Sequence, residues 1–265
     1  MRRFELVDTH CHLQFKDYEI DRAVVISDAV SAGVTKMVCV GTSVDDSQSA
    51  ISLAEEYPNI WAAAGEHPHR ATEFLATTGS ANLLEQLLSH PKMVAIGEIG
   101  LDYYRMHSPK KDQLEALKIQ MQIGRRAQKP FVFHIREAFD DFWPIYDQFG
   151  GGAAGVVHSF SDSATNLHKA VERGLHVALN GIMTYTKNSD WLEAAKRVPL
   201  DRLVLETDAP FLAPADVRGQ RCEPKNIKDI AEFLAGHRGE SVEDLANATT
   251  KNAVSLFGLG KAPKK

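Results

Sequence analysis

Short apolar runs rich in β-branched residues alternate with longer amphipathic stretches along most of this chain. The runs are apolar almost throughout, which is typical of strands buried on both faces of a parallel sheet. Eight such strands joined by helices predict an α/β fold, a single (β/α)8 TIM-type barrel, with a doubly wound open sheet as the alternative. The predicted strands span residues 4–8, 36–40, 60–65, 93–98, 131–134, 155–158, 176–180 and 203–208, and helices are expected at 18–33, 45–57, 80–90, 110–128 and 163–174.

The composition is that of an ordinary globular protein. Hydrophobic residues make up 44% of the 265 residues and charged residues 25%, which excludes disorder and collagen-like order. No Gly/Ser linker or charge block divides the chain, so we predict one domain over residues 1–258 and a frayed tail over 259–265. The net charge of −5 argues against a general nucleic-acid coat protein, although local cations could still attract phosphate.

Targeting and disulfide signals are not expected here. The apolar stretch near the start is short and interrupted by Glu5 and Asp8, which fits neither a signal peptide nor a membrane span. The cysteines are odd in number and form no CxxC pair, so neither a disulfide framework nor a zinc knuckle is predicted. We therefore expect a cytoplasmic monomer with no membrane contact. The cysteines are Cys11, Cys39 and Cys222.

Polar residues close most of the predicted strands. In a (β/α)8 barrel, the loops after the strands form one mouth where the chemistry takes place, so a polar residue that ends a strand is informative. We expect all of these side chains to meet above that mouth. They are Asp8, His10 and His12, then Glu66 and His67, and then Glu98, His134, His158 and Asp208.

The first group has the form of a metal site. His10 and His12 are two residues apart on a strand, so they point the same way while Cys11 turns toward the helices. Two imidazoles can hold one divalent ion, with Asp8 as a third ligand or as a partner that orients a ring. Two hydrogen-bonded structural histidines are the alternative. Four histidines with two carboxylates suffice for two cations that share a carboxylate, and mixed N/O ligands suit zinc, manganese or, less readily, magnesium.

Six separate motifs carry a resemblance to a known family. They are "VDTHCHL", "GEHPH", "IGEIGLDYYR", "FVFHIR", "GVVHSFSDS" and "LVLETDAPFLAP" followed by "RGQRCEP". In this order and spacing, the chain resembles the TatD family of metal-dependent deoxyribonucleases, a branch of the amidohydrolase-type metallohydrolases.

The resemblance implies a site and an activity. It implies that His10, His12 and Asp208 hold one metal, that His134 and His158 hold the second, and that Glu98 bridges the two. It also implies a cytoplasmic hydrolase best known for 3′ to 5′ exonuclease cleavage of single-stranded DNA. Two positions depart from the family pattern. Cys222 stands where the family usually has Asn, and Glu66 adds a negative charge beside the mouth.

Two cations could ionise a bridging water and clamp a phosphodiester. Asp208 is then placed to accept the proton, with a capping role as its alternative. Glu98 could instead pair with Arg105 or Arg136. The substrate contacts that we expect are His67, Arg136, Arg218 and Arg221, and either Tyr103 or Tyr104 could stack on a base.

Three functions remain open at this level. The first is a two-metal phosphodiesterase that acts on single-stranded DNA or another phosphodiester. The second is a hydrolase of a C–N or ester bond in a small molecule or aminoacyl ester, since fold and ligands do not separate the two. The third is a non-catalytic metal-binding scaffold, although six candidate ligands for two metals leave coordination positions open for water.

Overall fold

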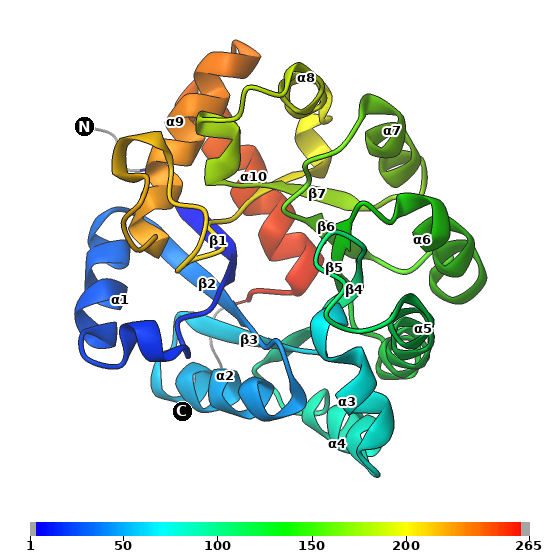
Figure 1. Cartoon of the computed structure of the whole chain (residues 1–265). Helices are drawn as coiled ribbons and strands as arrows, with labels where there is room; N and C mark the ends of the chain where they lie inside the picture. Colours follow the sequence, from blue (N-terminus) through cyan, green and yellow to red (C-terminus); the bar gives the residue numbers. More distant parts are fainter. Residues whose placement is uncertain (1–3, 261–265) are drawn as a thin grey trace.

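The computed structural model describes residues 4–260, and its strands form one parallel sheet in chain order from β1 to β8 (Figure 1). The sheet closes on itself, because the amide of His12 donates to Ala209 O (2.7 Å) and the amide of Asp208 to His10 O (2.9 Å). The predicted (β/α)8 barrel is therefore confirmed, and the open sheet is excluded. The strands are β1 (Leu6–Cys11), β2 (Val34–Val40), β3 (Ile60–Ala64), β4 (Met93–Asp102), β5 (Phe131–Arg136), β6 (Gly155–His158), β7 (His176–Leu179) and β8 (Leu203–Leu205).

Helices surround the barrel in the described residues, and most of them connect successive strands (Figure 1). Several begin at side chains that cap free amides, as Ser43 does for the helix after β2. The helices are α1 (Arg22–Ser31), α2 (Val44–Glu56), α3 (Ala71–Ala76), α4 (Ser80–Leu87), α5 (Lys110–Ala127), α6 (Phe139–Ile145), α7 (Ala164–Glu172), α8 (Ser189–Arg197), α9 (Ile227–Arg238) and α10 (Val242–Phe257).

The apolar residues form two separate layers. One cluster lies between the strands and the helices, and the other takes residues from all eight strands, which is possible only inside the barrel. Leu256, Phe257 and Leu259 join the inner cluster from the end of α10, which passes behind the strands in Figure 1. The end of α10 therefore closes the barrel at the amino ends of its strands, and polar residues are left for the carboxyl ends.

Several predicted boundaries differ from the structure, among them the start of α1 and the ends of β4 and β8. The helix expected from residue 18 begins at Arg22, because Tyr18 is buried and its hydroxyl donates to Cys222 O. Strand β8 ends at Leu205 rather than at residue 208, and Asp208 has a left-handed backbone with φ +61°. Strand β4 extends beyond residue 98 to Asp102, where it still pairs with β5.

The start of the predicted tail packs against the barrel. Of the tail predicted over 259–265, Leu259 is buried against the inner cluster, and residues 261–265 lie outside the described part. Among residues 4–260, none of the helices combines the length and the apolar character that crossing a bilayer demands.

Candidate metal centre

His10 and His12 lie side by side at the carboxyl end of β1, with their Nε2 atoms 3.2 Å apart. Between Asp8 and Cys11, three steps along β1 are opposed by only two along β2, which is a β-bulge. A bulge changes the face toward which the following side chains point. It lets Val7 fill the barrel interior while His10 and His12, of opposite parity, also turn inward at the mouth. In a regular strand, residues of opposite parity point to opposite faces, so Val7 and the two histidines could not all point inward without the bulge.

Glu98 lies at the centre of the histidines. Its Oε1 is 2.7 Å from His134 Nδ1 and 3.5 Å from His158 Nε2, and its Oε2 is 3.6 Å from His10 Nε2. It lies within a second bulge, since the pairing of β4 with β5 shifts between residues 96 and 99. Gly100 then allows the two strands to approach, because a Cβ atom there would lie 1.9 Å from His134 O. Glu98 thus contacts histidines from three strands, as a bridging ligand would.

Asp208 completes the cluster from the loop after β8. Its Oδ1 lies 3.4 Å from His12 Nε2, 3.8 Å from His10 Nε2 and 4.0 Å from His158 Nε2. The left-handed backbone at Asp208 is uncommon for a residue other than glycine, although aspartate tolerates it better than most. The amide of Asp208 donates the hydrogen bond that helps to close the barrel. Closure and placement of the carboxylate therefore depend on the same contact.

Three of the histidines are held by acceptors outside the cluster. A carbonyl or carboxylate oxygen can only accept, so the ring nitrogen facing it carries the hydrogen and the other nitrogen of a neutral ring offers a lone pair to the centre. This is the arrangement that metal-binding histidines require. The contacts are His12 Nδ1 to Val40 O (2.7 Å), His134 Nε2 to Asp102 Oδ2 (3.1 Å) and His158 Nδ1 to Glu206 Oε2 (3.0 Å).

Two of these acceptors, Asp102 and Glu206, were missed in the sequence. Asp102 also accepts from His69 Nε2 at 3.0 Å, and Glu206 accepts from the amide of Ser159 at 2.7 Å. Both carboxylates are buried. They stand at strand ends in "GLDYY" and "LETD", so the rule that selected the other strand-end residues could have found them. Strand ends do not reveal which acid faces the cation and which faces a ring.

Buried charges in the cluster shift each other's pKa. Burial raises the pKa of Glu98, but the surrounding histidines, His67, His158, His10 and His134, together outweigh that effect and hold it well below its usual range. Burial lowers the pKa of His158, yet Glu206 and Glu98 raise it to about 10. The pKa of His134 is likewise raised, to about 8, whereas burial lowers the pKa of His10 and of His67. The cluster thus combines anionic carboxylates with some imidazoles that carry protons when no cation is present and others that are neutral. Since metal ligation needs neutral imidazole, cation binding would release those protons.

The donor set fits divalent cations. Three groups of three side chains bring their ligand atoms within 4.8 Å of one another. Zinc–nitrogen bonds of about 2.0–2.1 Å allow two ligand nitrogens to stand as close as those of His10 and His12. Within residues 4–260, the buried Nδ1 of His10 finds no hydrogen-bond partner, so no hydrogen bond to that atom orients the ring. The groups are His10, His12 and Asp208; His10, His158 and Glu206; and His67, Glu98 and His134.

Two of the four predicted substrate contacts are engaged inside the protein. His67 lies in the cluster itself, with Nε2 3.7 Å from Glu98 Oε1, rather than at its rim. The guanidinium of Arg221 pairs with both carboxylate oxygens of Asp21 (2.9 and 2.7 Å) and with Glu223 (2.9 Å). This pairing ties the loop after β8 to the start of α1. It favours a structural role for Arg221.

The other two arginines lie over tyrosine rings. The guanidinium carbon of Arg136 is 3.9 Å from the ring centre of Tyr104, and that of Arg218 is 4.2 Å from the ring centre of Tyr185. Tyr104 follows β4 and Arg136 ends the neighbouring β5, whereas Tyr185 and Arg218 follow the neighbouring strands β7 and β8. Both pairs therefore stand at the mouth of the barrel, at the end that carries the cluster.

Two acidic residues have roles other than those expected. Asp8 accepts from the amide (3.0 Å) and hydroxyl (2.6 Å) of Thr207, so it joins β1 to the segment after β8 and orients no imidazole ring. Burial raises the pKa of Asp8 to about 7 against these hydrogen bonds. Glu66 accepts from the amide of Val44 (3.0 Å) and from Arg70 Nε (3.1 Å). The first turn of α2 and Arg70, which also pairs with Glu73, partly compensate the negative charge that the sequence placed beside the mouth.

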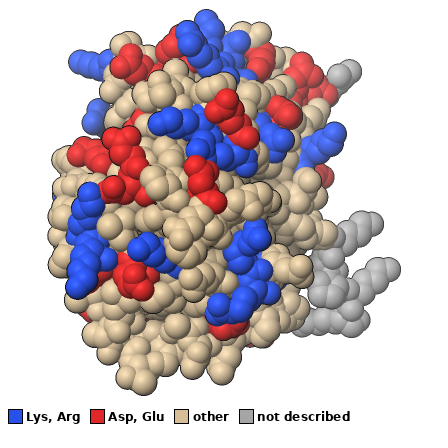
Figure 2. Space-filling view, turned by 90° about the vertical axis from the view of Figure 1, so that its right-hand side faces the viewer, with Lys and Arg blue, Asp and Glu red and all other residues tan. Residues whose placement is uncertain are grey.

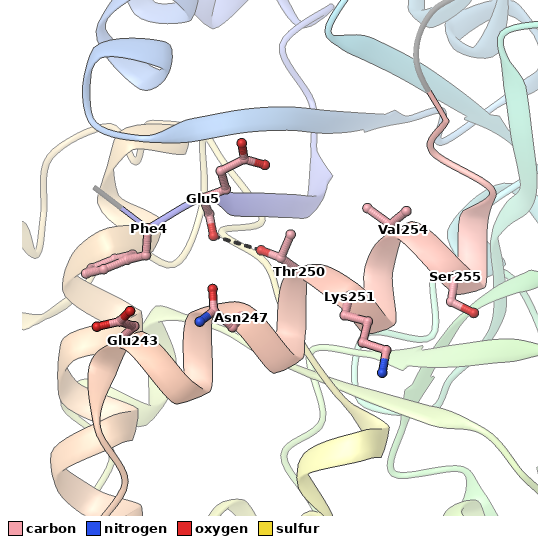
Figure 3. Close-up of a pocket in the computed structure, with 8 residues that line it drawn as sticks. All are labelled: Phe4, Glu5, Glu243, Asn247, Thr250, Lys251, Val254 and Ser255. Atoms are coloured by element: carbon pink, nitrogen blue, oxygen red, sulfur yellow. Dashed lines mark hydrogen bonds between the residues drawn. The ribbon is translucent and has the colours of Figure 1, made fainter. Parts of the chain in front are cut away.

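A separate surface pocket lies between the residues before β1 and helix α10 (Figure 3). Thr250 Oγ1 donates to Glu5 O across it at 2.8 Å. Glu5 precedes β1, so this pocket is at the amino ends of the strands, away from the histidines. Its lining residues are Phe4, Glu5, Glu243, Asn247, Thr250, Lys251, Val254 and Ser255.

A closed (β/α)8 barrel whose mouth gathers histidines and carboxylates defines the class of metal-dependent hydrolases. The family described as TatD related DNase matches residues 7–258. The chain therefore belongs to the TatD family, as its motifs indicated.

Individual relatives agree with this assignment. The chain is 36% identical over 255 residues to YabD of Bacillus subtilis, described as an uncharacterized metal-dependent hydrolase, with 96% of this chain and 99% of YabD covered. It is 34% identical over 260 residues to the 3′-5′ ssDNA/RNA exonuclease TatD of Citrobacter rodentium, with 96% and 98% covered. The crystal structure of YJJV, a TatD homologue from Escherichia coli K12, superposes with a TM-score of 0.88 at 29% identity, with 96% and 98% covered.

Proposed function

We propose that this hydrolase is a deoxyribonuclease that removes nucleotides from the 3′ end of single-stranded DNA. The observation that carries the proposal is that His10, His12, His134 and His158 meet Glu98 and Asp208 in one cluster, with Arg136 and Arg218 at the rim of the same mouth. One guanidinium group can donate two parallel hydrogen bonds to the oxygens of a phosphate, so the position of these arginines suits a phosphodiester. A relative at 34% identity that bears the name of an ssDNA/RNA exonuclease supports this substrate.

We assign His10, His12 and Asp208 to one divalent cation, His134 and His158 to a second, and Glu98 to both. The mixed nitrogen and oxygen donors suit zinc, manganese or magnesium. When bound, such cations lower the pKa of a water and neutralise charge on a phosphodiester.

The chain itself supplies the proton acceptor. His10, His12 and His158 all approach the same oxygen of Asp208, Oδ1, which leaves Oδ2 to take a proton from the attacking water. Burial raises the pKa of Asp208, but the neighbouring histidines lower it overall, so the carboxylate is ionised and able to accept a proton. Glu98 holds the two halves of the cluster together.

Positive charge for the substrate is concentrated at the mouth in this proposal. Figure 2 shows one flank of the molecule, where basic and acidic side chains lie next to each other. Such a mixed surface produces little net field for a polyanion. The rim arginines and bound cations would thus guide the end of a strand to the site, which agrees with a net charge of −5.

The test compares substrate classes on one preparation. The chelator-treated protein is reloaded with Mn²⁺, Mg²⁺ or Zn²⁺ and given a 5′-labelled oligothymidylate, the same strand in a duplex, and a panel of amides, esters and lactones. We expect metal-dependent shortening of the single strand from its 3′ end. Turnover of carbonyl substrates alone would refute the phosphodiesterase and favour C–N or ester hydrolysis.

A matched pair of variants distinguishes cleavage by this site from cleavage by a contaminating nuclease. Asp208→Asn should abolish cleavage, whereas Asp216→Asn, in the same loop, should not. A preparation that binds metal yet hydrolyses nothing would favour the scaffold. The cytoplasmic monomer expected from the sequence stays a prediction.

A further inference from the structure

Tyr104 and Phe211 are the two strongly exposed aromatic side chains among residues 4–260, at 53% and 52% of their full exposure. Other Phe, Tyr and Trp side chains of the described chain are buried or half-buried. Tyr104 follows β4, and Phe211 follows β8. Both therefore stand at the mouth, and a strand order of β1 to β8 around a closed barrel places β4 and β8 on opposite sides of it. Exposed aromatic rings on the two sides of a candidate site suggest that a ligand of the site packs against these rings.

Phe211 is held directly against the cluster. Its amide donates to the carbonyl of Asp208 at 2.8 Å. Its ring meets the stacked rings of His12 and Phe15 edge-on, with centres 6.2 and 6.3 Å away and interplanar angles of 65° and 73°. These contacts orient the ring while half of it stays open to solvent. An exposed ring in a fixed orientation beside candidate metal ligands is suited to stacking on a substrate group next to the reacting bond.

Tyr104 combines an exposed ring with positive charge. Arg136 lies over it at 3.9 Å from the ring centre, and Arg105 lies farther away at 5.3 Å. Its neighbour Tyr103 is engaged differently, since its hydroxyl donates to Asp141 at 2.8 Å and its ring is half-buried. The structure thus distinguishes the two tyrosines: Tyr103 packs, and Tyr104 is available. A ring beside a guanidinium is the combination that binds a base and the phosphate next to it.

We propose that Phe211 and Tyr104 bind unpaired nucleobases by stacking, on opposite sides of the mouth. The proposal rests on the nuclease function proposed above and adds to it the part of the substrate that is recognised. Every base has an aromatic face, so stacking binds strands with little regard to sequence. In a duplex, those faces are covered by neighbouring base pairs. The two rings would therefore select single strands and frayed ends over intact duplex.

The test separates bases from backbone. Asp208→Asn serves as the background so that strands stay intact, and Phe211→Ala, Tyr104→Ala and both together are added to it. Fluorescence anisotropy then measures binding of a labelled oligothymidylate and of an abasic strand of equal length. The conservative variants Phe211→Trp and Tyr104→Phe keep an aromatic ring. Val30→Ala, at an exposed position near the end of α1, is the matched control for loss of exposed apolar surface.

Each alanine should weaken oligothymidylate binding at least about fivefold, the lower limit for one base stacked on an aromatic ring. The double variant should multiply the two losses, because the side chains are far apart. Affinity for the abasic strand should change less than about twofold, and the aromatic replacements and Val30→Ala should bind as the background does.

Two results would overturn the inference and leave the nuclease in place. Oligothymidylate affinity could be unchanged in the double variant, or both strands could weaken equally, which would make the rings backbone contacts. If the metal-loaded wild-type protein cleaves no phosphodiester and the background binds no oligothymidylate, the proposed function fails and the stacking role fails with it. If the wild-type protein shortens the single strand but the alanine variants bind oligothymidylate as tightly as the background, only the stacking role is contradicted.

Discussion

Replacing Glu206 with glutamine tests how the ring of His158 is held for a cation. Glu206 accepts from His158 Nδ1 (3.0 Å), from the amide of Ser159 (2.7 Å) and from Asn180 Nδ2 (3.1 Å). The amide oxygen of glutamine can keep the contacts to Ser159 and Asn180, which both approach Oε1. Its NH₂ group would then face His158 Nδ1 in place of Oε2. That nitrogen would have to accept, so the hydrogen would move to Nε2, the atom directed at Glu98 and the cation.

The expected effect follows from this tautomer change. Loss of such a partner weakens metal binding by about 10- to 100-fold, or about 1.4–2.7 kcal/mol. Isothermal titration of Mn²⁺ into the chelator-treated protein measures the change, and thermal unfolding followed by circular dichroism checks that the variant folds. Glu55→Gln is the matched control, because Glu55 pairs with His90 at 3.1 Å on the surface, away from the cluster. Mn²⁺ affinity of Glu206→Gln within about twofold of wild type would refute the reasoning.

Three further predictions follow from single contacts. Asp208→Asn should lower kcat at least about 100-fold, as loss of a general base does. The fold should stay intact because asparagine tolerates the left-handed backbone. Stopped-time cleavage assays measure kcat, and a near-normal value would contradict the role of Asp208 as proton acceptor. Gly100→Ala should lower the free energy of unfolding by about 1–3 kcal/mol or more, because the added Cβ would collide with His134 O. Urea unfolding measures this loss, and a variant as stable as wild type would show that β4 and β5 can move apart to fit the methyl group. Arg221→Ala should lower the thermal midpoint with little change in KM, since its guanidinium pairs with Asp21; a KM that rose with an unchanged midpoint would restore Arg221 as a substrate contact.

The strand-end residues show how much of the site could be predicted from the sequence alone. The strand-end rule selects six residues because parallel strands in a barrel bring their carboxyl ends together, whatever the loops between them. They are His10, His12, Glu98, His134, His158 and Asp208. The structure gathers them, with contacts of 2.7–4.0 Å among the cluster. That convergence needs only the order of strands and helices, which apolar periodicity reveals.

Other parts of the site could not be derived in this way. Asp8 and Glu206 are both acids close to a candidate ligand in sequence, yet Asp8 bonds to Thr207 and Glu206 holds His158. The difference arises from a bulge in β1 and from the early end of β8, which set the direction of each side chain. A shift of one residue reverses the face of a strand, and local sequence does not reveal such a shift.

Arg221 and Arg136 illustrate the same limit at the rim. Both are arginines predicted to follow strands, so the sequence predicts the same role for them, although the structure places Arg136 at the end of β5 itself. Asp21 lies 200 residues from Arg221 in the chain and still neutralises it, whereas Arg136 stays over an exposed ring. By itself the sequence determined the barrel, its mouth and the donors placed there, because these depend on periodicity and element order. Only the tertiary structure decided which donor faces a cation, which orients a ring and which charge is already paired, because those roles depend on contacts between distant segments.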